Sequence, residues 1–226
     1  MHNPTNKVLV IAPHLDDEIL GCGGVIAYHL SIGDRVNVCF VADRVYNHIY
    51  DKDAVETQRR HALDAQKAIG YQSAHYLCLH DERLDTCAQD IIVPLEEYVY
   101  KFRPEIVYSP YQYDNNQDHQ AVAKAVQVVL RPLAAVFVKR WLMYETPSST
   151  EQAPNIISPM FRPNTYCDIE RYLETKLNAW KCYKNENRCY PHPRSSRAIQ
   201  ALTMKRGMEA GLANAEAFML VREKYA

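Results

Sequence analysis

The sequence lacks any apolar run that approaches the roughly 20 residues needed to cross a bilayer. It also lacks a basic leader followed by an apolar stretch and a small-residue cleavage site, so we expect no secretion signal. The 27 acidic and 26 basic residues nearly balance, which gives a formal net charge of −1. This balance gives no case for nucleic-acid or anionic-membrane binding, and it is compatible with a homo-oligomer.

Paired cysteine motifs are also missing. The seven cysteines are an odd number and include no CxxC pair, which argues against a disulfide framework and against a cysteine-rich zinc site. Two of them, Cys39 and Cys78, lie inside apolar runs, where buried thiols are expected. Free thiols of this kind are typical of a reducing compartment, so we predict a cytoplasmic protein.

Short apolar runs alternate with longer helical patterns over the first two thirds of the chain. This alternation predicts strands at residues 7–12, 35–42, 75–79, 105–109 and within 134–144. It predicts helices at residues 18–32, 54–69, 88–102 and 118–130, the third with an interruption near Pro94 as an option. Strands that alternate with helices predict an α/β fold, a Rossmann-like three-layer sandwich around a mainly parallel sheet.

The last third of the chain has a different pattern. Residues 145–167 are rich in Pro, Ser and Thr and have the character of a long ordered excursion. After them we predict helices at residues 168–183 and 195–209 and a closing strand at residues 217–221. No repeat or Gly/Ser-rich linker divides the sequence, so we predict a single domain over residues 1–226.

Carboxylates crowd the turn after the first predicted strand, which contains His14, Asp16, Asp17 and Glu18. Asp118 and His119 follow the fourth predicted strand, and the carboxyl ends of parallel strands form one ligand-binding rim. A divalent cation relieves the repulsion between neighbouring carboxylates, and catalytic Zn²⁺ binds imidazole and carboxylate while keeping one position for water. Each cluster alone is more simply explained as a helix cap, but the two together indicate a metal site at the carboxyl ends of the strands.

A family resemblance rests on several motifs of this sequence. PHLDDE at residues 13–18, followed by GCGG at 21–24, resembles the (A/P)HPDDE signature of the LmbE-like, or PIG-L, N-deacetylase family. DHQAV at residues 118–122 resembles its second motif, HPDHxAV, and HDERL at 80–84 resembles its PDGxL turn. The similarity continues through HPRS at 192–195 and AEAF at 215–218. It implies a hydrolase that removes an acyl group from an amide nitrogen.

Carried over position by position, the resemblance implies roles for residues of this chain. His14, Asp17 and His119 would bind Zn²⁺ or another divalent metal. Asp16 would be the general base that acts on the attacking water, and Asp118 would orient a histidine from outside the metal shell.

Five further residues are predicted to contact the substrate: Arg59, Tyr113, Asn116, His192 and Arg194. Each has a plainer explanation as a helix, loop or corner residue, and the same holds for Asp43 at the end of the second predicted strand. Asn116 also marks a departure from the family, because it replaces the first His of HPDH. An amide cannot act as an acid near neutral pH, so the leaving amine would take its proton from Asp16 or His192. Leu15, in place of the usual Pro, should alter only the turn.

The leading prediction is a zinc-dependent N-deacetylase of an N-acetylglucosamine-type sugar or sugar conjugate. The first alternative is a zinc amidase that acts on a non-sugar amide or thiol conjugate. The second, of another class, is a non-catalytic nucleotide-binding α/β module, suggested by the glycines at 21–24. These glycines do not form GxGxxG, and the carboxylates before them would repel phosphate. The expected partner is a small-molecule amide or amino sugar.

Overall fold

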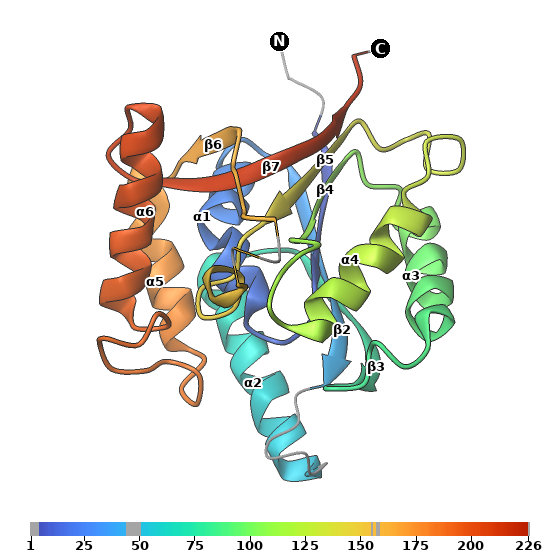
Figure 1. Cartoon of the computed structure of the whole chain (residues 1–226), viewed down its shortest axis with the longest axis horizontal. Helices are drawn as coiled ribbons and strands as arrows, with labels where there is room; N and C mark the ends of the chain where they lie inside the picture. Colours follow the sequence, from blue (N-terminus) through green and yellow to red (C-terminus); the bar gives the residue numbers. More distant parts are fainter. Residues whose placement is uncertain (1–4, 44–50, 155, 157–158, 226) are drawn as a thin grey trace.

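The computed structural model describes residues 5–43, 51–154, 156 and 159–225. Within these residues, seven strands form one sheet in the order β3-β2-β1-β4-β5-β7-β6 (Figure 1). The strands are β1 (Lys7–Ala12), β2 (Arg35–Asp43), β3 (Ser73–His80), β4 (Ile106–Pro110), β5 (Arg140–Tyr144), β6 (Thr165–Asp168) and β7 (Ala215–Glu223). The first five pair in parallel, and β7 runs antiparallel to both β5 and β6. The carboxyl ends of β1 to β4 therefore share one edge.

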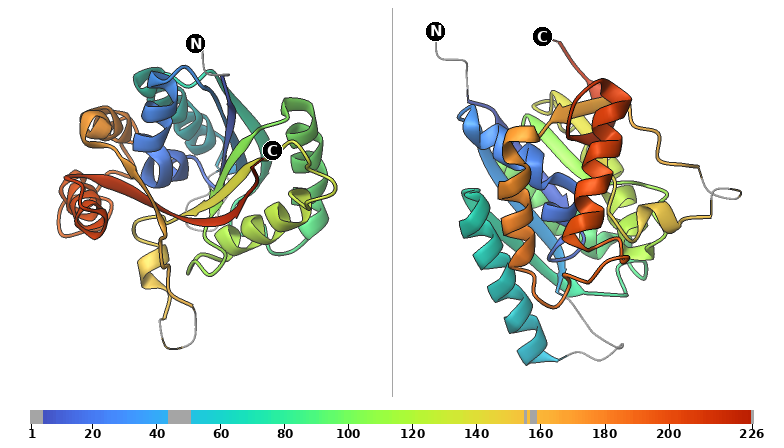
Figure 2. Two further views of the ribbon diagram at one scale, coloured as in Figure 1. Left: turned by 90° about the horizontal axis from the view of Figure 1, so that it is seen from above. Right: turned by 90° about the vertical axis from the view of Figure 1, so that its left-hand side faces the viewer.

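Helices cover both faces of this sheet (Figure 2). One face carries α1 (Asp17–Ser31), α2 (Lys52–Ile69), α5 (Leu173–Lys181) and α6 (Ser196–Ala210), and the other carries α3 (Ala88–Phe102) and α4 (Gln117–Val129). This arrangement confirms the predicted three-layer α/β sandwich with a mainly parallel sheet. None of the described helices combines the length and the apolar character that a bilayer span requires.

The central strand β1 shows how the sequence produces the two layers of core. Its side chains alternate between two buried clusters, with Val8, Val10 and Ala12 in the cluster under α1 and α5. Leu9 and Ile11 belong to the cluster under α3 and α4. A parallel strand covered on both faces needs a continuous apolar run, which is what this segment supplies.

Two local features differ from the sequence-based expectation. α3 runs through Pro94 without a break, because burial of Ile91, Leu95 and Val99 outweighs the one backbone hydrogen bond that a proline removes. The expectation of a buried Cys78 is wrong, since this residue is exposed on the edge strand β3 with a left-handed φ of 58°. Cys39, on the interior strand β2, is buried as predicted.

The sequence pattern does not predict β6. This strand has only four residues, lies at the other edge of the sheet and carries no alternation signal within the Pro, Ser and Thr-rich segment. It includes Asp168, the first residue of the helix predicted for residues 168–183, and the observed helix α5 begins later, at Leu173. A single 3₁₀ turn at Glu170–Tyr172 precedes α5. The last third of the chain thus adds two strands to the same sheet.

Close packing explains the glycines of α1. A Cβ atom at Gly21 would overlap the ring of Tyr144, and one at Gly24 would lie 2.6 Å from Cγ2 of Ile169. Both glycines lie inside the helix rather than in the preceding turn. They allow neighbouring elements to approach α1. Because they lie within the helix, they do not form the strand-to-helix loop that a nucleotide-binding module uses for phosphate.

A buried ion pair braces α1 from the last third of the chain. Lys176 Nζ lies 2.6 Å from Glu216 Oε1 and donates to the carbonyl oxygen of Leu20 at 2.8 Å. The Glu216 carboxylate accepts the backbone N–H groups of Gly24 and Val25, both at 2.7 Å. The pair therefore serves the carbonyl of residue 20 and the N–H of residue 24, groups that ordinary helix geometry would join to each other.

Replacement of Glu216 by Ala should lower the free energy of unfolding by about 3–5 kcal/mol, because the ammonium of Lys176 would remain buried without its counter-charge. Urea denaturation measures this loss. The matched control is Glu56→Ala, which breaks the exposed Lys52–Glu56 pair of α2. That control should cost less than about 1 kcal/mol. An equally small loss for Glu216→Ala would contradict the proposed bracing.

Candidate active site

The turn between β1 and α1 places its polar residues at the edge of the sheet. α1 begins at Asp17. The residue before it, Asp16, has a backbone φ of 151°, which residues other than glycine rarely adopt. Its side chain makes no capping bond to the helix. Strained backbone of this kind persists only where its surroundings enforce it, and it is typical of functional sites.

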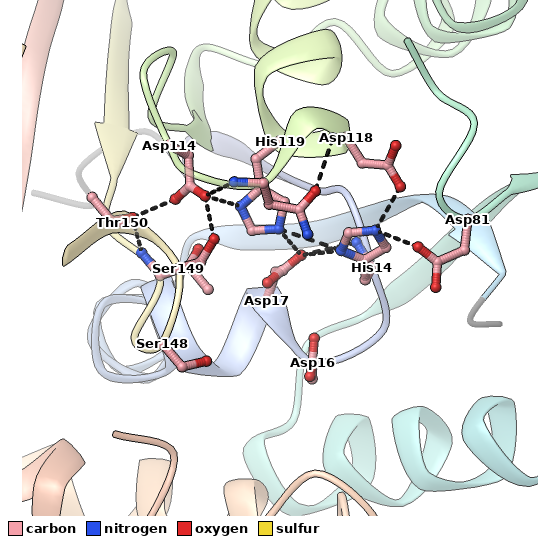
Figure 3. Close-up of polar contacts among 12 residues, drawn as sticks. His14, Asp16, Asp17, Asp81, Asp114, Asp118, His119, Ser148, Ser149 and Thr150 are labelled. Carbon is pink, nitrogen blue, oxygen red and sulfur yellow. Dashed lines mark hydrogen bonds and ion pairs between the residues drawn. The ribbon is translucent and has the colours of Figure 1, made fainter. Parts of the chain in front are cut away.

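Three side chains from this turn and from α4 meet at one buried point (Figure 3). His14 Nδ1 lies 3.3 Å from Asp17 Oδ2, and His119 Nε2 lies 3.2 Å from the same oxygen. The two ring nitrogens are 3.3 Å apart. Ligands about 2.0 Å from a tetrahedral zinc ion are separated by about 3.3 Å. The three donor atoms, which we call the donor triangle, therefore match three corners of a zinc tetrahedron.

Each histidine of the donor triangle has its second ring nitrogen next to carboxylates. His14 Nε2 lies 2.9 Å from Asp81 Oδ1 and 3.2 Å from Asp118 Oδ2. His119 Nδ1 is 3.5 Å from Asp114 Oδ1, close enough for an ion pair but beyond good hydrogen-bond geometry. Carboxylates in this position fix the tautomer and the orientation of metal-binding histidines. Asp118 thus lies where an orienting residue is expected.

The two supporting aspartates on the α4 side are held in different ways. Asp118 accepts the backbone N–H groups of Glu82 at 2.6 Å and Leu84 at 3.1 Å, which ties it to the loop after β3. It does not cap α4; the side chain of Asn116 does so, by accepting the N–H of Asp118. Asp114 accepts the hydroxyl groups of Ser149 and Thr150, the latter at 2.5 Å. These residues come from the loop after β5.

The sequence analysis does not identify Asp81 and Asp114 as residues of the site. Both follow strands of the predicted sheet, β3 and β4, at the edge that carries His14. Asp81 even lies within the HDERL segment at residues 80–84. Their position could have been inferred from the strand order, but the sequence alone does not say that β3 and β4 flank the pair β2 and β1.

The electrostatic environment of the donor triangle is strongly negative. Burial alone would lower the pKa of His119, but the carboxylates of Asp17 and Asp114 outweigh it and raise the value to about 9. In the same way, carboxylates raise the pKa of His14 well above its usual range despite burial. Burial opposes ionisation of Asp17, yet the two histidines hold the pKa of Asp17 well below its usual range. A field that attracts protons this strongly also favours a divalent cation.

An unsatisfied atom supports the fit of a metal ion. Asp17 Oδ1, the second oxygen of the carboxylate whose Oδ2 belongs to the donor triangle, is buried and has no hydrogen-bond partner among the described residues. A buried carboxylate oxygen without a partner is costly unless a cation or ordered water serves it. Two imidazoles and one carboxylate are also a donor set that zinc accepts. The residues present therefore fit a divalent metal.

Glu18 is the second residue of α1. Its carboxylate is buried and accepts the hydroxyl of Tyr183 at 2.6 Å. Burial, assisted by the charges of Asp16 and Asp17, raises the pKa of Glu18 to about 8. The residue therefore links the turn to the segment after α5.

Three of the residues predicted to contact the substrate make other contacts. Arg59 is bound through two nitrogens to Asp43, at 3.0 and 2.7 Å, at the end of β2. Tyr113 is 42% exposed, and its ring lies edge-on to Tyr111. Asn116 is the cap of α4 described above. These three residues lie on loops or helices of the rim, but none is a member of the donor triangle.

The other two residues predicted to contact the substrate, His192 and Arg194, lie in the loop before α6 and differ in their surroundings. Arg194 Nη1 lies 3.0 Å from Asp16 Oδ2, so this loop reaches the turn after β1. His192 is exposed, and its Nδ1 accepts the backbone N–H of Arg194 at 3.1 Å. Burial and the nearby charges of Arg194 and Arg188 lower the pKa of His192.

Comparison with known proteins identifies the family. The model of the family PIG-L, described as GlcNAc-PI de-N-acetylase, matches residues 9–130, which is more than half of the chain. The chain belongs to this family. A related protein, the uncharacterized deacetylase YaiS of Escherichia coli K12, is 29% identical over 189 residues, covering 81% of this chain and 93% of YaiS.

Solved structures share the fold of this PIG-L family member. The N,N'-diacetylchitobiose deacetylase of Pyrococcus horikoshii has a TM-score of 0.77 at 17% identity and covers 96% of this chain and 84% of its own. The 4-carboxy-2-hydroxymuconate hydratase GalB of Pseudomonas putida has a TM-score of 0.78 at 19% identity and covers 98% of both chains. A deacetylase and a hydratase on one fold mean that the reaction must be argued from the site.

Replacement of His119 by Ala should abolish stoichiometric metal binding, because one corner of the donor triangle is lost. Asp114→Ala should weaken metal affinity about 10–100-fold, as expected when a supporting carboxylate is removed. Elemental analysis together with chelator competition measures both effects. The matched control is Asp43→Asn, an aspartate on the same edge that binds Arg59 instead. Equal metal content in His119→Ala and the parent protein would contradict the proposed site.

Proposed function

We propose that this protein is a metal-dependent N-deacetylase that hydrolyses the N-acetyl amide of an amino sugar or sugar conjugate. Membership of the PIG-L family and the deacetylases among its relatives support a hydrolase that acts on amides. The observation that carries the proposal is the buried donor triangle together with Asp16, which has a strained backbone and directly precedes Asp17 in the chain.

His14, Asp17 and His119 would hold the metal, which we propose to be Zn²⁺, with another divalent ion as the alternative. When bound, the metal would supply Lewis acidity toward the acyl oxygen and the attacking water. Asp81, Asp118 and Asp114 keep the two imidazoles in place. The protein's contribution to this step is a preorganised arrangement that needs little rearrangement during the reaction.

Asp16 is the proposed general base. Its carboxylate accepts a proton from water as the water oxygen forms a bond to the acyl carbon, so the base must be ionised and fixed. The backbone at Asp16 and its contact with Arg194 hold the carboxylate at the turn that also presents His14 and Asp17.

Cleavage of the C–N bond requires a proton on the leaving nitrogen. Asn116 cannot supply one, because an amide does not titrate and its oxygen caps α4. His192 is exposed, and a lowered pKa leaves it mainly neutral near pH 7. We therefore assign the return of the proton to Asp16, which releases to the amine the proton it took from water.

The surroundings of the site favour a sugar over a simple amide. A cavity of about 500 Å³ is lined by His80, Asp81, Glu82, Arg83, Asn116 and Gln117. Asp81 of this cavity is one of the two aspartates that contact His14 Nε2. Side chains that are all polar suit a ligand rich in hydroxyl groups, because an apolar ligand would leave them without hydrogen-bond partners.

Replacement of Asp16 by Asn should lower the kcat of acetate release about 10²–10⁴-fold, the usual contribution of a general base, and leave metal content unchanged. Acetate release and elemental analysis on the same preparation test this. Near-parental kcat in Asp16→Asn would contradict the assignment of the base.

The substrate class is tested by measuring acetate release over a panel of N-acetylated sugars, sugar conjugates and simple aliphatic amides. We expect kcat/KM to be highest for substrates that carry a sugar ring. Preference for simple amides would support the non-sugar amidase instead, and no acetate release from any of them would refute the deacetylase.

A further inference from the structure

The base Asp16 is held by a residue that comes from far along the chain. Arg194 lies in the loop before α6, and its guanidinium is mostly buried, with 14% of the side chain exposed. Nη1 contacts Asp16 Oδ2 at 3.0 Å and Glu186 Oε2 at 2.7 Å. The guanidinium therefore bridges two carboxylates, one at the turn after β1 and one after α5.

The Arg194 guanidinium is held by Glu186 on the side away from Asp16. Glu186 is buried, and its other carboxylate oxygen accepts the side-chain amide of Gln58 at 3.1 Å. Gln58, on α2, is fully buried. A continuous line of buried polar contacts thus runs from Asp16 through Arg194 and Glu186 to α2. Because a buried Glu186 without a cation would be costly, the position of Arg194 is fixed independently of any substrate.

A second anchor joins the bridge to the donor triangle. Arg194 Nε donates to Ser148 Oγ at 2.6 Å, and Ser148 has a left-handed φ of 70°. The next two residues of this loop, Ser149 and Thr150, donate their hydroxyl groups to Asp114, which lies against His119. Figure 3 shows this loop beside the donor triangle, with Ser148 on the side of Asp16. One loop therefore contacts both the support of the base and the support of a metal-binding histidine.

We infer that Arg194 is a positioning residue for Asp16 rather than a substrate contact: it fixes the carboxylate of the base in one orientation through Glu186 and Ser148. The inference rests on the proposed function for the role of Asp16, whereas the contacts themselves do not depend on it. An arginine suits this position because its planar fork can bond several acceptors at fixed angles, which the single ammonium of lysine cannot do.

Kinetics separate the two roles of Arg194. Arg194→Ala should lower kcat about 100-fold, a loss typical of a misplaced catalytic group, with KM within about threefold and metal content unchanged. Arg194→Lys should recover only a small part of kcat, and guanidinium ion added to Arg194→Ala should recover more. Glu186→Gln should lower kcat in the same direction, and combining it with Arg194→Ala should add little. A raised KM with parental kcat would show a substrate contact and overturn the inference.

The matched control is Arg197→Ala, which removes an arginine of α6 that stacks on Tyr190. It should leave kcat within about twofold, because loosening this loop alone does not release Asp16. A loss as large as that of Arg194→Ala would overturn the inference.

A second measurement needs no substrate. In a double-mutant cycle of Asp16→Asn and Arg194→Ala, the shifts in urea midpoint should be strongly non-additive, because each variant removes the same contact. Additive shifts would overturn the inference, whereas an inactive parent protein with non-additive shifts would refute the proposed function and leave the Asp16–Arg194 restraint standing.

Discussion

The structure depends on the concentration of buried carboxylates around two imidazoles at one edge of the sheet. Asp16, Asp17, Asp81, Asp114 and Asp118 are each at most 3% exposed. Burial of so many acids is unfavourable unless positive charge and N–H donors compensate it. His14 and His119 supply part of the compensation, backbone N–H groups and Arg194 supply more, and a divalent cation at the donor triangle would complete it.

The fold meets this requirement from two directions. The parallel strands β1, β3 and β4 bring the loops with the histidines and aspartates to a common edge. The last third of the chain then supports the turn after β1 and the helix α1 that follows it. The Lys176–Glu216 pair contacts α1, Tyr183 contacts Glu18, and Arg194 contacts Asp16. All of these supports lie beyond residues 9–130, the part that matches the PIG-L model. The residues that carry the chemistry therefore rely on contacts from a part of the chain that the family model does not match.

Much of the fold could be predicted, because the signals were local. The apolar run of β1 and the glycine stop at Gly70 specify a buried strand and a helix end without reference to the rest of the chain. Where tertiary contacts decide the outcome, the sequence was a poorer guide. The exposure of Cys78 follows from the place of β3 at the edge, and β6 forms only because β7 is available to pair with it.

The candidate site follows the same division. The donor triangle could be proposed from two motifs because each ligand lies in a short segment after a strand. Asp81 and Asp114 acquire their roles from the strand order, which the sequence does not state. Arg59 has an arginine's capacity to bind substrate, yet its partner is Asp43 across the rim. The contact of Arg194 with Asp16 joins residues 178 positions apart, and no local pattern encodes it.

Stepwise return of metal to chelator-treated protein tests the central claim most directly. Acetate release from an N-acetylated sugar should rise in proportion to bound Zn²⁺, or to another divalent ion, and reach its maximum at one metal per chain. His119→Ala should show no such saturation at the same metal concentrations. Full acetate release from protein shown by elemental analysis to be metal-free would contradict the claim.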